Sequence, residues 1–288
     1  MSSLPSYRFG ISEFTTWPWS FQEDVENYAR LGVETIEVCE FKLDESRIEE
    51  QLALVRDHGL EISSVQPAVR TLFPSQSQPK PGDIGERMAR FRQTIERFHS
   101  AAGTAPFVTN TGIPPGGNVQ QVFDVAQREY RALCDFAAGH GARIAIEPLN
   151  PSIANIESAI WTLEQGMQIV EAVDRPNMGI CLDVWNIWQN ADVESAIRSC
   201  GDRVFVVQIS DWRTPRSYQD RLIPGQGSIP LPRLLRAIHD SGFCGAYAVE
   251  IFSGDVPDSL WSGDLTRVIT QSRKGLDAAW RQAFSDVA

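Results

Sequence analysis

Lysine is scarce in this sequence, and no run of basic residues occurs. The 288 residues include 37 acidic and 26 basic ones, which gives a formal net charge of −11. A protein that binds nucleic acid usually presents a basic face to the phosphates, so we expect no nucleic-acid partner. The few lysines also leave little choice for a Schiff-base mechanism, for which Lys42 is a candidate because it follows a predicted strand.

Paired cysteines and long apolar runs are missing as well. The five cysteines are odd in number and widely spaced, and no CxxC motif occurs, which argues against a zinc ribbon and a disulfide framework. No stretch approaches the roughly 20 apolar residues that cross a membrane, and the first residues lack the charged-then-apolar pattern of a signal peptide. We therefore expect no membrane partner and a reducing, cytoplasmic location.

Short apolar runs alternate with amphipathic stretches from end to end. Strands are predicted at Tyr7–Ile11, Thr35–Val38, Glu61–Val65, Phe107–Asn110, Ala142–Glu147, Met178–Asp183, Val204–Ser210 and Ala246–Glu250. Helices are predicted between them, for example at Phe21–Leu31, Glu45–Asp57, Ile84–Ala101, Val119–Ala138, Ile156–Val173 and Leu231–Asp240.

This alternation predicts an α/β fold of one domain over residues 1–288, a closed (β/α)8 TIM barrel. Hydrophobic residues make up 42% of the chain, which is enough for a substantial core. No GxGxxG follows the first strand, which argues against a dinucleotide-binding fold.

One segment, Leu72 to Gly82, interrupts the rhythm with several prolines, serines and glutamines. It follows the third predicted strand and therefore lies on the face of the barrel where the strands end. Two interpretations stay open from the sequence: a floppy insertion, or a lid over the barrel mouth.

Each of the last four predicted strands delivers a residue with an oxygen ligand near its end. These residues are Glu147, Asp183, Gln208 and Glu250. In a barrel the carboxyl ends of the strands meet at one mouth, so these side chains should converge. Three carboxylates in one small space repel one another unless a cation lies between them. The alternative is that polar residues end these strands simply because loops begin there.

Oxygen ligands of this kind favour Mn²⁺ or Mg²⁺ over zinc, so one divalent cation is the expected cofactor. The four histidines support this expectation. All of them, His58, His99, His140 and His239, fall in predicted helices or in helix C-terminal turns, so we expect no imidazole ligand.

Five motifs in the second half carry a resemblance to a known family. They are IleGluProLeuAsn150, LeuAspValTrpAsn186, GlnIleSerAsp211, ArgLeuIleProGlyGlnGly227 and ValGluIlePhe252. With them, nearly the whole chain resembles the xylose isomerase-like TIM-barrel superfamily of sugar and sugar-phosphate isomerases and epimerases. Ketose 3-epimerases and hydroxypyruvate isomerase-like proteins are among its members.

The resemblance implies roles for several residues. It implies that the metal ligands are Glu147, Asp183, Gln208 and Glu250, and that Glu147 and Glu250 also form an acid/base pair. It implies further that Arg221 holds substrate oxygens. To these we add Trp185, Asn186 and Asp211, which lie in the same motifs, as expected substrate contacts.

Two positions depart from the usual family pattern. Many relatives have histidine where this chain has Gln208 and where it has Asn186. A glutamine amide oxygen can bind Mn²⁺ or Mg²⁺, so the metal site survives the first change. Asn186 does not titrate near neutral pH, so a mechanism that needs a histidine at that position is in doubt.

The chemistry that the resemblance implies is proton abstraction next to a carbonyl, through an enediolate that the metal stabilises. If a proton returns to the enediolate, the enzyme is a sugar or sugar-phosphate isomerase or epimerase. Loss of a leaving group from the same intermediate gives a lyase, either a keto-sugar dehydratase or a C-glycoside deglycosidase-like enzyme. A non-catalytic barrel subunit is the alternative of another class. A DNA-repair endonuclease is disfavoured because the chain lacks histidine ligands and a basic groove.

The expected partner is a small-molecule carbohydrate or a related keto compound, and a homo-oligomer stays open. Two further groups of residues bear on the substrate. Tryptophans that follow strands or lie in loops suggest either rim packing or an apolar wall for a substrate; they are Trp17, Trp19, Trp185, Trp188, Trp212 and Trp261. Arg213, Arg216 and Arg221 suggest either solvated loop charge or a site for a phosphorylated or carboxylated substrate.

Overall fold

Eight parallel strands close into a barrel in the computed structural model, which describes residues 4–215, 220–254 and 256–285. Neighbours in sequence are neighbours in the ring, and β1 pairs with β8 to complete it. The strands are β1 (Arg8–Ser12), β2 (Thr35–Cys39), β3 (Glu61–Gln66), β4 (Pro106–Thr109), β5 (Arg143–Ile146), β6 (Met178–Asp183), β7 (Val204–Ile209) and β8 (Ala246–Val249). The predicted (β/α)8 barrel is confirmed.

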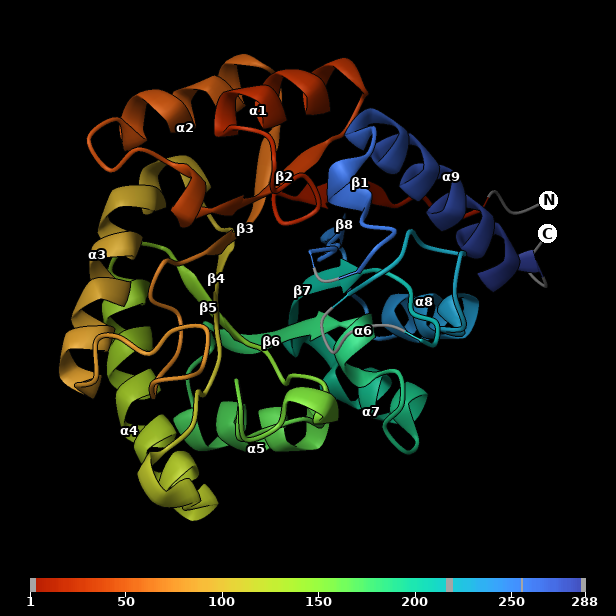
Figure 1. The fold of residues 1–288 in the computed structure, drawn as a ribbon. Coiled ribbons are helices and arrows are strands. Elements are labelled where there is room, and N and C mark those ends of the chain that lie inside the picture. Colours follow the sequence, from red (N-terminus) through yellow and green to blue (C-terminus); the bar gives the residue numbers. More distant parts are fainter. Residues whose placement is uncertain (1–3, 216–219, 255, 286–288) are drawn as a thin grey trace.

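Helices surround this ring, as Figure 1 shows. They are α1 (Phe21–Arg30), α2 (Ile48–Asp57), α3 (Ile84–Ala102), α4 (Val119–Ala138), α5 (Leu163–Val173), α6 (Val184–Ile187), α7 (Val193–Cys200), α8 (Leu231–Asp240) and α9 (Leu265–Ala283). Short 3-10 turns lie at Glu40–Lys42, Pro115–Gly117, Pro151–Ile153, Gly201–Arg203 and Leu260–Ser262.

Two predicted helix starts were wrong. The helix predicted from Ile156 begins only at Leu163, because Thr162 and Gln165 form a reciprocal capping box that fixes the start there. The helix predicted from Glu45 begins at Ile48. Before Leu163, the apolar residues Ile156, Ala159 and Ile160 continue the helical spacing into the loop, so the pattern alone did not mark the first turn there.

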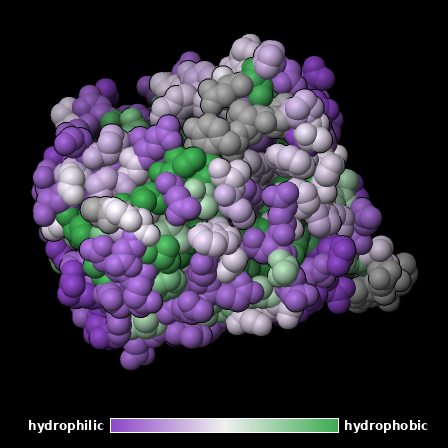
Figure 2. All heavy atoms as spheres, turned by 60° about the horizontal axis from the view of Figure 1, so that its bottom comes forward, coloured by the Kyte–Doolittle hydropathy of each residue, from purple (hydrophilic) through white to green (hydrophobic). Residues whose placement is uncertain are grey.

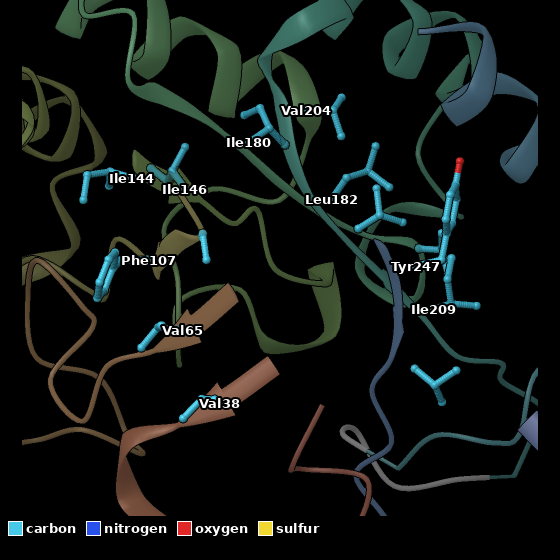
Figure 3. Packing of buried hydrophobic residues seen from close by; sticks show 14 of the residues in the cluster. Val38, Val65, Phe107, Ile144, Ile146, Ile180, Leu182, Val204, Ile209 and Tyr247 are labelled. Carbon is cyan, nitrogen blue, oxygen red and sulfur yellow. The ribbon is translucent and has the colours of Figure 1, made fainter. Parts of the chain in front are cut away.

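Two apolar clusters hold the barrel together. The larger one packs the strands against the helices, and Figure 3 shows its members Val65, Phe107 and Leu182 among others. The smaller one consists of Val108, Ala145, Cys181 and Val206. Because side chains alternate across a strand, these residues share a face with the residues two positions later. Ala145, Cys181 and Val206 therefore form an apolar layer beneath Glu147, Asp183 and Gln208.

The segment after β3 is held in place by a buried arginine of α3. Arg87 is fully buried, and its guanidinium donates to the carbonyl oxygens of Thr71 (2.6 Å) and Pro81 (2.6 Å). From the other side, Glu157 accepts hydrogen bonds from the backbone N–H (2.9 Å) and the hydroxyl (2.6 Å) of Ser77. These contacts hold the Leu72 to Gly82 segment in one position, which disfavours the interpretation as a floppy insertion.

The face of the molecule in Figure 2 is mostly hydrophilic. Hydrophobic residues on it form small groups among hydrophilic ones. Within the part of the chain that the structure describes, no helix has both the length and the apolar character needed to cross a bilayer.

Candidate active site

Three carboxylates converge at the end of the barrel where the strands terminate. Glu147 follows β5, Asp183 is the last residue of β6, and Glu250 follows β8. Each offers an oxygen atom, and these three atoms lie within 4.8 Å of one another. All three side chains are buried, with Asp183 fully so. The period-2 alternation along β5, β6 and β8 brings them together at the mouth of the barrel.

Arg221 and Asn186 both donate hydrogen bonds to this cluster. The guanidinium of Arg221 lies 2.9 Å from Asp183 Oδ2 and 2.5 Å from Glu250 Oε2. The amide of Asn186 donates to Glu147 Oε1 (2.8 Å) and to Asp183 Oδ2 (2.9 Å). Asn186 therefore ties two of the carboxylates together, although it cannot itself take up or release a proton.

Burial raises the pKa of all three carboxyl groups. For Glu147 it raises the pKa to about 7, with a further contribution from the neighbouring charge of Asp183. For Glu250 burial raises the pKa well above its usual range, although the positive charge of Arg221 opposes the shift. The pKa of Asp183 is raised for the same reason and is also opposed by Arg221. Raised pKa values clustered in one cavity mark these carboxyl groups as a candidate functional site.

The side-chain amide nitrogen of Gln208 points toward the carboxylates of Glu250 and Glu37. Its Nε2 donates to Glu250 Oε1 (2.8 Å) and to Glu37 Oε1 (2.9 Å), while its Oε1 accepts from the thiol of Cys181 (3.3 Å). Binding a metal through the amide oxygen therefore requires the amide to turn over. Glu37 opposes that turn because the oxygen would then face a buried carboxylate.

Glu37 is a member of the site that the sequence prediction missed. It lies in β2, is fully buried, and accepts a hydrogen bond from the hydroxyl of Ser64 (2.6 Å) besides those from Gln208. The available signal was the carboxylate inside the otherwise apolar run ThrIleGluValCys39. A charged residue in the middle of a buried strand needs a partner, and here the partner comes from the far side of the ring.

Asp211, predicted to contact substrate, does not line the cavity above the carboxylates. It is 1% exposed, and its carboxylate accepts hydrogen bonds from backbone N–H groups in the loop that follows β7. The donors are those of Trp212 (2.8 Å), Gly225 (2.9 Å), Gly227 (2.8 Å) and Ile229 (3.0 Å). Gly227 has no room for a side chain, because a Cβ there would lie 2.4 Å from Asp211 Oδ1. Asp211 thus shapes the loop that carries Arg221.

The carboxylates open into a cavity of about 410 Å³. Its floor includes Glu147, Glu250, Asn186 and Arg221, while Asp183 and Gln208 lie beneath the lining. Its other lining residues are Phe14, Trp17, Phe41, Gln66, Arg70, Thr71, Ser77, Gln78, Asn110, Leu149, Ile153, Glu157, Trp185 and Phe252.

The predicted aromatic and basic residues divide between the cavity and the rest of the molecule. Of the tryptophans, Trp17 and Trp185 line the cavity, and Trp261 stacks on Trp17 with 6.5 Å between ring centroids. Arg213 lies 3.5 Å from Asp258, away from the cavity. Arg216 lies outside the described residues.

Lys42, the Schiff-base candidate, does not line the cavity either. Its ammonium group forms a buried ion pair with Asp24 and lies 3.8 Å from Glu13. The geometry therefore offers no support for a Schiff-base reaction at this lysine.

A larger hollow of about 1350 Å³ lies at the opposite end of the barrel and extends between α2 and α3. Its lining includes Arg8, Glu61 and Arg143, where strands begin, and none of the predicted site residues. Because active sites of such barrels lie at the carboxyl ends of the strands, the smaller cavity is the candidate site.

A divalent cation fits the carboxylate cluster. Three buried carboxylates within reach of one another are the ligand type that hard divalent cations prefer. None of the four histidines belongs to the cluster: His58 caps α2, His99 and His239 lie in α3 and α8, and His140 follows α4. The expectation of a site without imidazole ligands agrees with this geometry within the described residues.

Comparison with known proteins assigns the family. The family model of the xylose isomerase-like TIM barrel matches residues 25–277. This chain belongs to that family. Inosose isomerase of Bacillus subtilis is 32% identical over 125 residues, which are 42% of this chain and 44% of that protein. The aligned part thus spans less than half of that relative.

Relatives over the whole length are more distant. A probable ketose 3-epimerase of Synechocystis is 22% identical over 286 residues, which cover 96% of this chain and 95% of that protein. The crystal structure of the IOLI protein with a bound zinc atom superposes with a TM-score of 0.80 at 21% identity, covering 96% of this chain and 99% of that one. The two relatives named here are thus an isomerase and a probable epimerase, and the structural neighbour holds a zinc atom.

Proposed function

We propose that this protein is a divalent-metal-dependent sugar isomerase or epimerase. The observation that carries the proposal is the convergence of Glu147, Asp183 and Glu250 beneath a cavity. Both glutamates line this cavity together with Arg221 and Asn186. The names of the relatives, inosose isomerase and ketose 3-epimerase, support the same reaction class.

Glu147, Asp183 and Glu250 would hold the cation, with Gln208 as a fourth ligand if its amide turns. Mn²⁺ and Mg²⁺ suit such oxygen ligands. When bound, the cation would supply a positive charge that polarises the substrate carbonyl and acidifies the neighbouring C–H bond.

Glu147 and Glu250 are the proposed acid/base pair. They follow β5 and β8, with β6 and β7 between them, so they approach a substrate on the floor from two sides. One glutamate takes the proton from the carbon next to the carbonyl, and the electron pair of that C–H bond moves into the enediolate. The other glutamate returns a proton to the opposite face or to the neighbouring carbon.

Arg221 and Trp185 would position the substrate. Arg221 already faces Glu250, and its guanidinium carbon lies 5.0 Å from the Trp185 ring centroid, which limits its freedom. A clamp of this kind orients a carbonyl compound for proton transfer without taking part in it.

A lyase is the second candidate function. Trp17 is 41% exposed and Phe41 45% exposed, and both line the cavity, so its mouth presents more apolar surface than a bare sugar needs. In a lyase the enediolate would expel a β-substituent instead of taking up the returned proton.

Proton NMR in D₂O tests the proposal and separates the two reactions. With ketoses as substrates and Mn²⁺ or Mg²⁺ added, an isomerase or epimerase incorporates deuterium without losing water or a substituent. Glu147→Gln and Glu250→Gln should abolish this incorporation. If both variants enolise every tested ketose as fast as the wild type, the proposal fails.

A further inference from the structure

Arg70 is a cation on the cavity wall that forms no ion pair within the part of the chain that the structure describes. It follows β3, is half-buried, and lines the same cavity as Glu147 and Glu250. Among the residues that the structure describes, no carboxylate lies within ion-pair distance of its guanidinium. Arg221, by contrast, lies against both Asp183 and Glu250.

Two aromatic rings hold the Arg70 side chain. Its guanidinium carbon lies 6.0 Å from the ring centroid of Phe14 and 5.8 Å from that of Phe41. Contacts of this kind restrict the guanidinium but leave its N–H donors without acceptors. A restricted guanidinium with free donors suits a phosphate or a carboxylate, which can accept two of its hydrogen bonds at once.

The backbone that carries Arg70 is fixed as well. The Arg70 N–H donates to Gln78 Oε1 (3.1 Å), and its carbonyl oxygen accepts from Thr109 Oγ1 (2.7 Å) and from Asn110 N (3.1 Å). Arg87 holds the next residue, Thr71, through its carbonyl oxygen. Arg70 is therefore placed by its surroundings, unlike a solvated loop charge.

The cavity that Arg70 lines also contains acidic residues. Glu147 and Glu250 line the floor, and Glu157 lines the wall, so an anionic substrate would meet repulsion on entry. Glu157 is bound to Ser77, and Arg221 is bound to the floor carboxylates. Among the described lining residues, Arg70 is thus the cation that remains available to an incoming anion.

We propose that Arg70 recognises an anionic group, a phosphate or a carboxylate, that the substrate carries away from its reacting carbonyl. This inference rests on the proposed function, because it takes the carboxylate floor as the place where the carbonyl binds. If Arg70 has this role, the preferred substrate is a sugar phosphate or a sugar acid. The anionic group of the substrate would then bind to Arg70 and not to the arginines in the loop after β7.

Binding measurements test the inference without requiring turnover. Titration calorimetry with D-fructose, D-fructose 6-phosphate and the corresponding 6-carboxylate compares one ketose with and without an anion. Wild-type protein should bind at least one anionic probe on the order of 10- to 100-fold more tightly than D-fructose, as expected for a charged hydrogen-bonded pair. The probe with the larger preference identifies the anion.

Three variants assign the preference to a residue. Arg70→Met keeps the apolar stem between Phe14 and Phe41 and should remove most of the preference. Arg70→Lys keeps the positive charge but lacks the planar guanidinium that donates two parallel hydrogen bonds. This variant should retain part of the preference for the anionic probes. Arg213→Met is the matched control, since Arg213 lies outside the cavity, and it should retain the full preference.

Equal affinity of the wild type for all three probes, no binding of either anionic probe, or an unchanged preference in Arg70→Met would overturn the inference. Thermal melting of Arg70→Met checks that the variant is folded. The proposed reaction fails separately: a protein that prefers the anionic probes through Arg70 but exchanges no deuterium would refute the isomerase assignment and leave this inference standing.

Discussion

Two sets of buried carboxylates, one in each half of the barrel, have different surroundings. In the first half, Glu37 binds Ser64 and Gln208, and Glu40 accepts from Ala68 N (2.7 Å) and Thr94 (2.7 Å). In the second half, Glu147, Asp183 and Glu250 point at one another with one arginine between them.

The difference separates structural charges from functional ones. A buried carboxylate with several donors is stabilised where it is, whereas three that converge gain from an added cation. The arrangement of the second half costs stability in the free protein, and a ligand can recover that stability on binding.

Replacing a carboxylate of the second half should remove the chemistry. We expect Glu250→Gln to slow deuterium incorporation into substrate about 1,000-fold, within the range for loss of a general acid or base. Glu40→Gln, the matched change in the first half, lies outside the cavity and should slow it less than about threefold. Equal losses in the two variants, measured by NMR in D₂O, would erase the distinction between the halves.

Removing the metal should destabilise the wild type. With Mn²⁺ at 100 times its dissociation constant, we expect a gain of about 2.7 kcal/mol in the free energy of unfolding, reversed by EDTA. Asp183→Asn should lose this gain because one ligand of the cluster is gone. Urea denaturation with and without Mn²⁺ measures it, and a wild type that is indifferent to both Mn²⁺ and EDTA would favour a barrel without a catalytic metal.

Neutralising a carboxylate of the first half should destabilise the protein itself. Glu37→Gln weakens the charged hydrogen bonds from Ser64 and Gln208, at an expected cost of about 1–3 kcal/mol in the metal-free free energy of unfolding. Asp183→Asn should cost less in the same measurement, because it relieves repulsion. A stability gain in Glu37→Gln would show that Glu37 is a poorly compensated charge like those of the second half.

The stability of the metal-free protein should depend on pH through Glu147. Its pKa is raised from an ordinary value of 4.5 to about 7, so the protonated carboxyl stabilises the folded state. This contribution is complete below pH 4.5, falls by at most about 1.4 kcal/mol per pH unit up to pH 7, and is absent above. Urea denaturation of wild type and Glu147→Gln between pH 5 and 8 isolates it, and identical pH profiles would contradict the assignment.

The sequence predicted the fold and the second-half carboxylates for a physical reason. The alternation of apolar runs and helices defines a barrel, and a polar residue at the end of an apolar strand must lie at its mouth. Glu147, Asp183 and Glu250 could therefore be named from the sequence alone.

The features that the sequence did not predict depend on contacts between residues far apart in the chain. Glu37 meets Gln208 although 171 positions separate them, and the direction of the Gln208 amide follows from that contact. Arg70 lies beyond the end of its strand, where the spacing rule gives no orientation. Asp211 was named from its motif, yet its carboxylate binds backbone N–H groups that only the folded loop brings together.

Anomalous diffraction from crystals grown with Mn²⁺ shows directly whether the three carboxylates bind a cation. We expect one peak that lies within about 2.1–2.3 Å of an oxygen from each of Glu147, Asp183 and Glu250, with Arg221 displaced from Asp183. No peak at saturating Mn²⁺, with Arg221 still between Asp183 and Glu250, would contradict it.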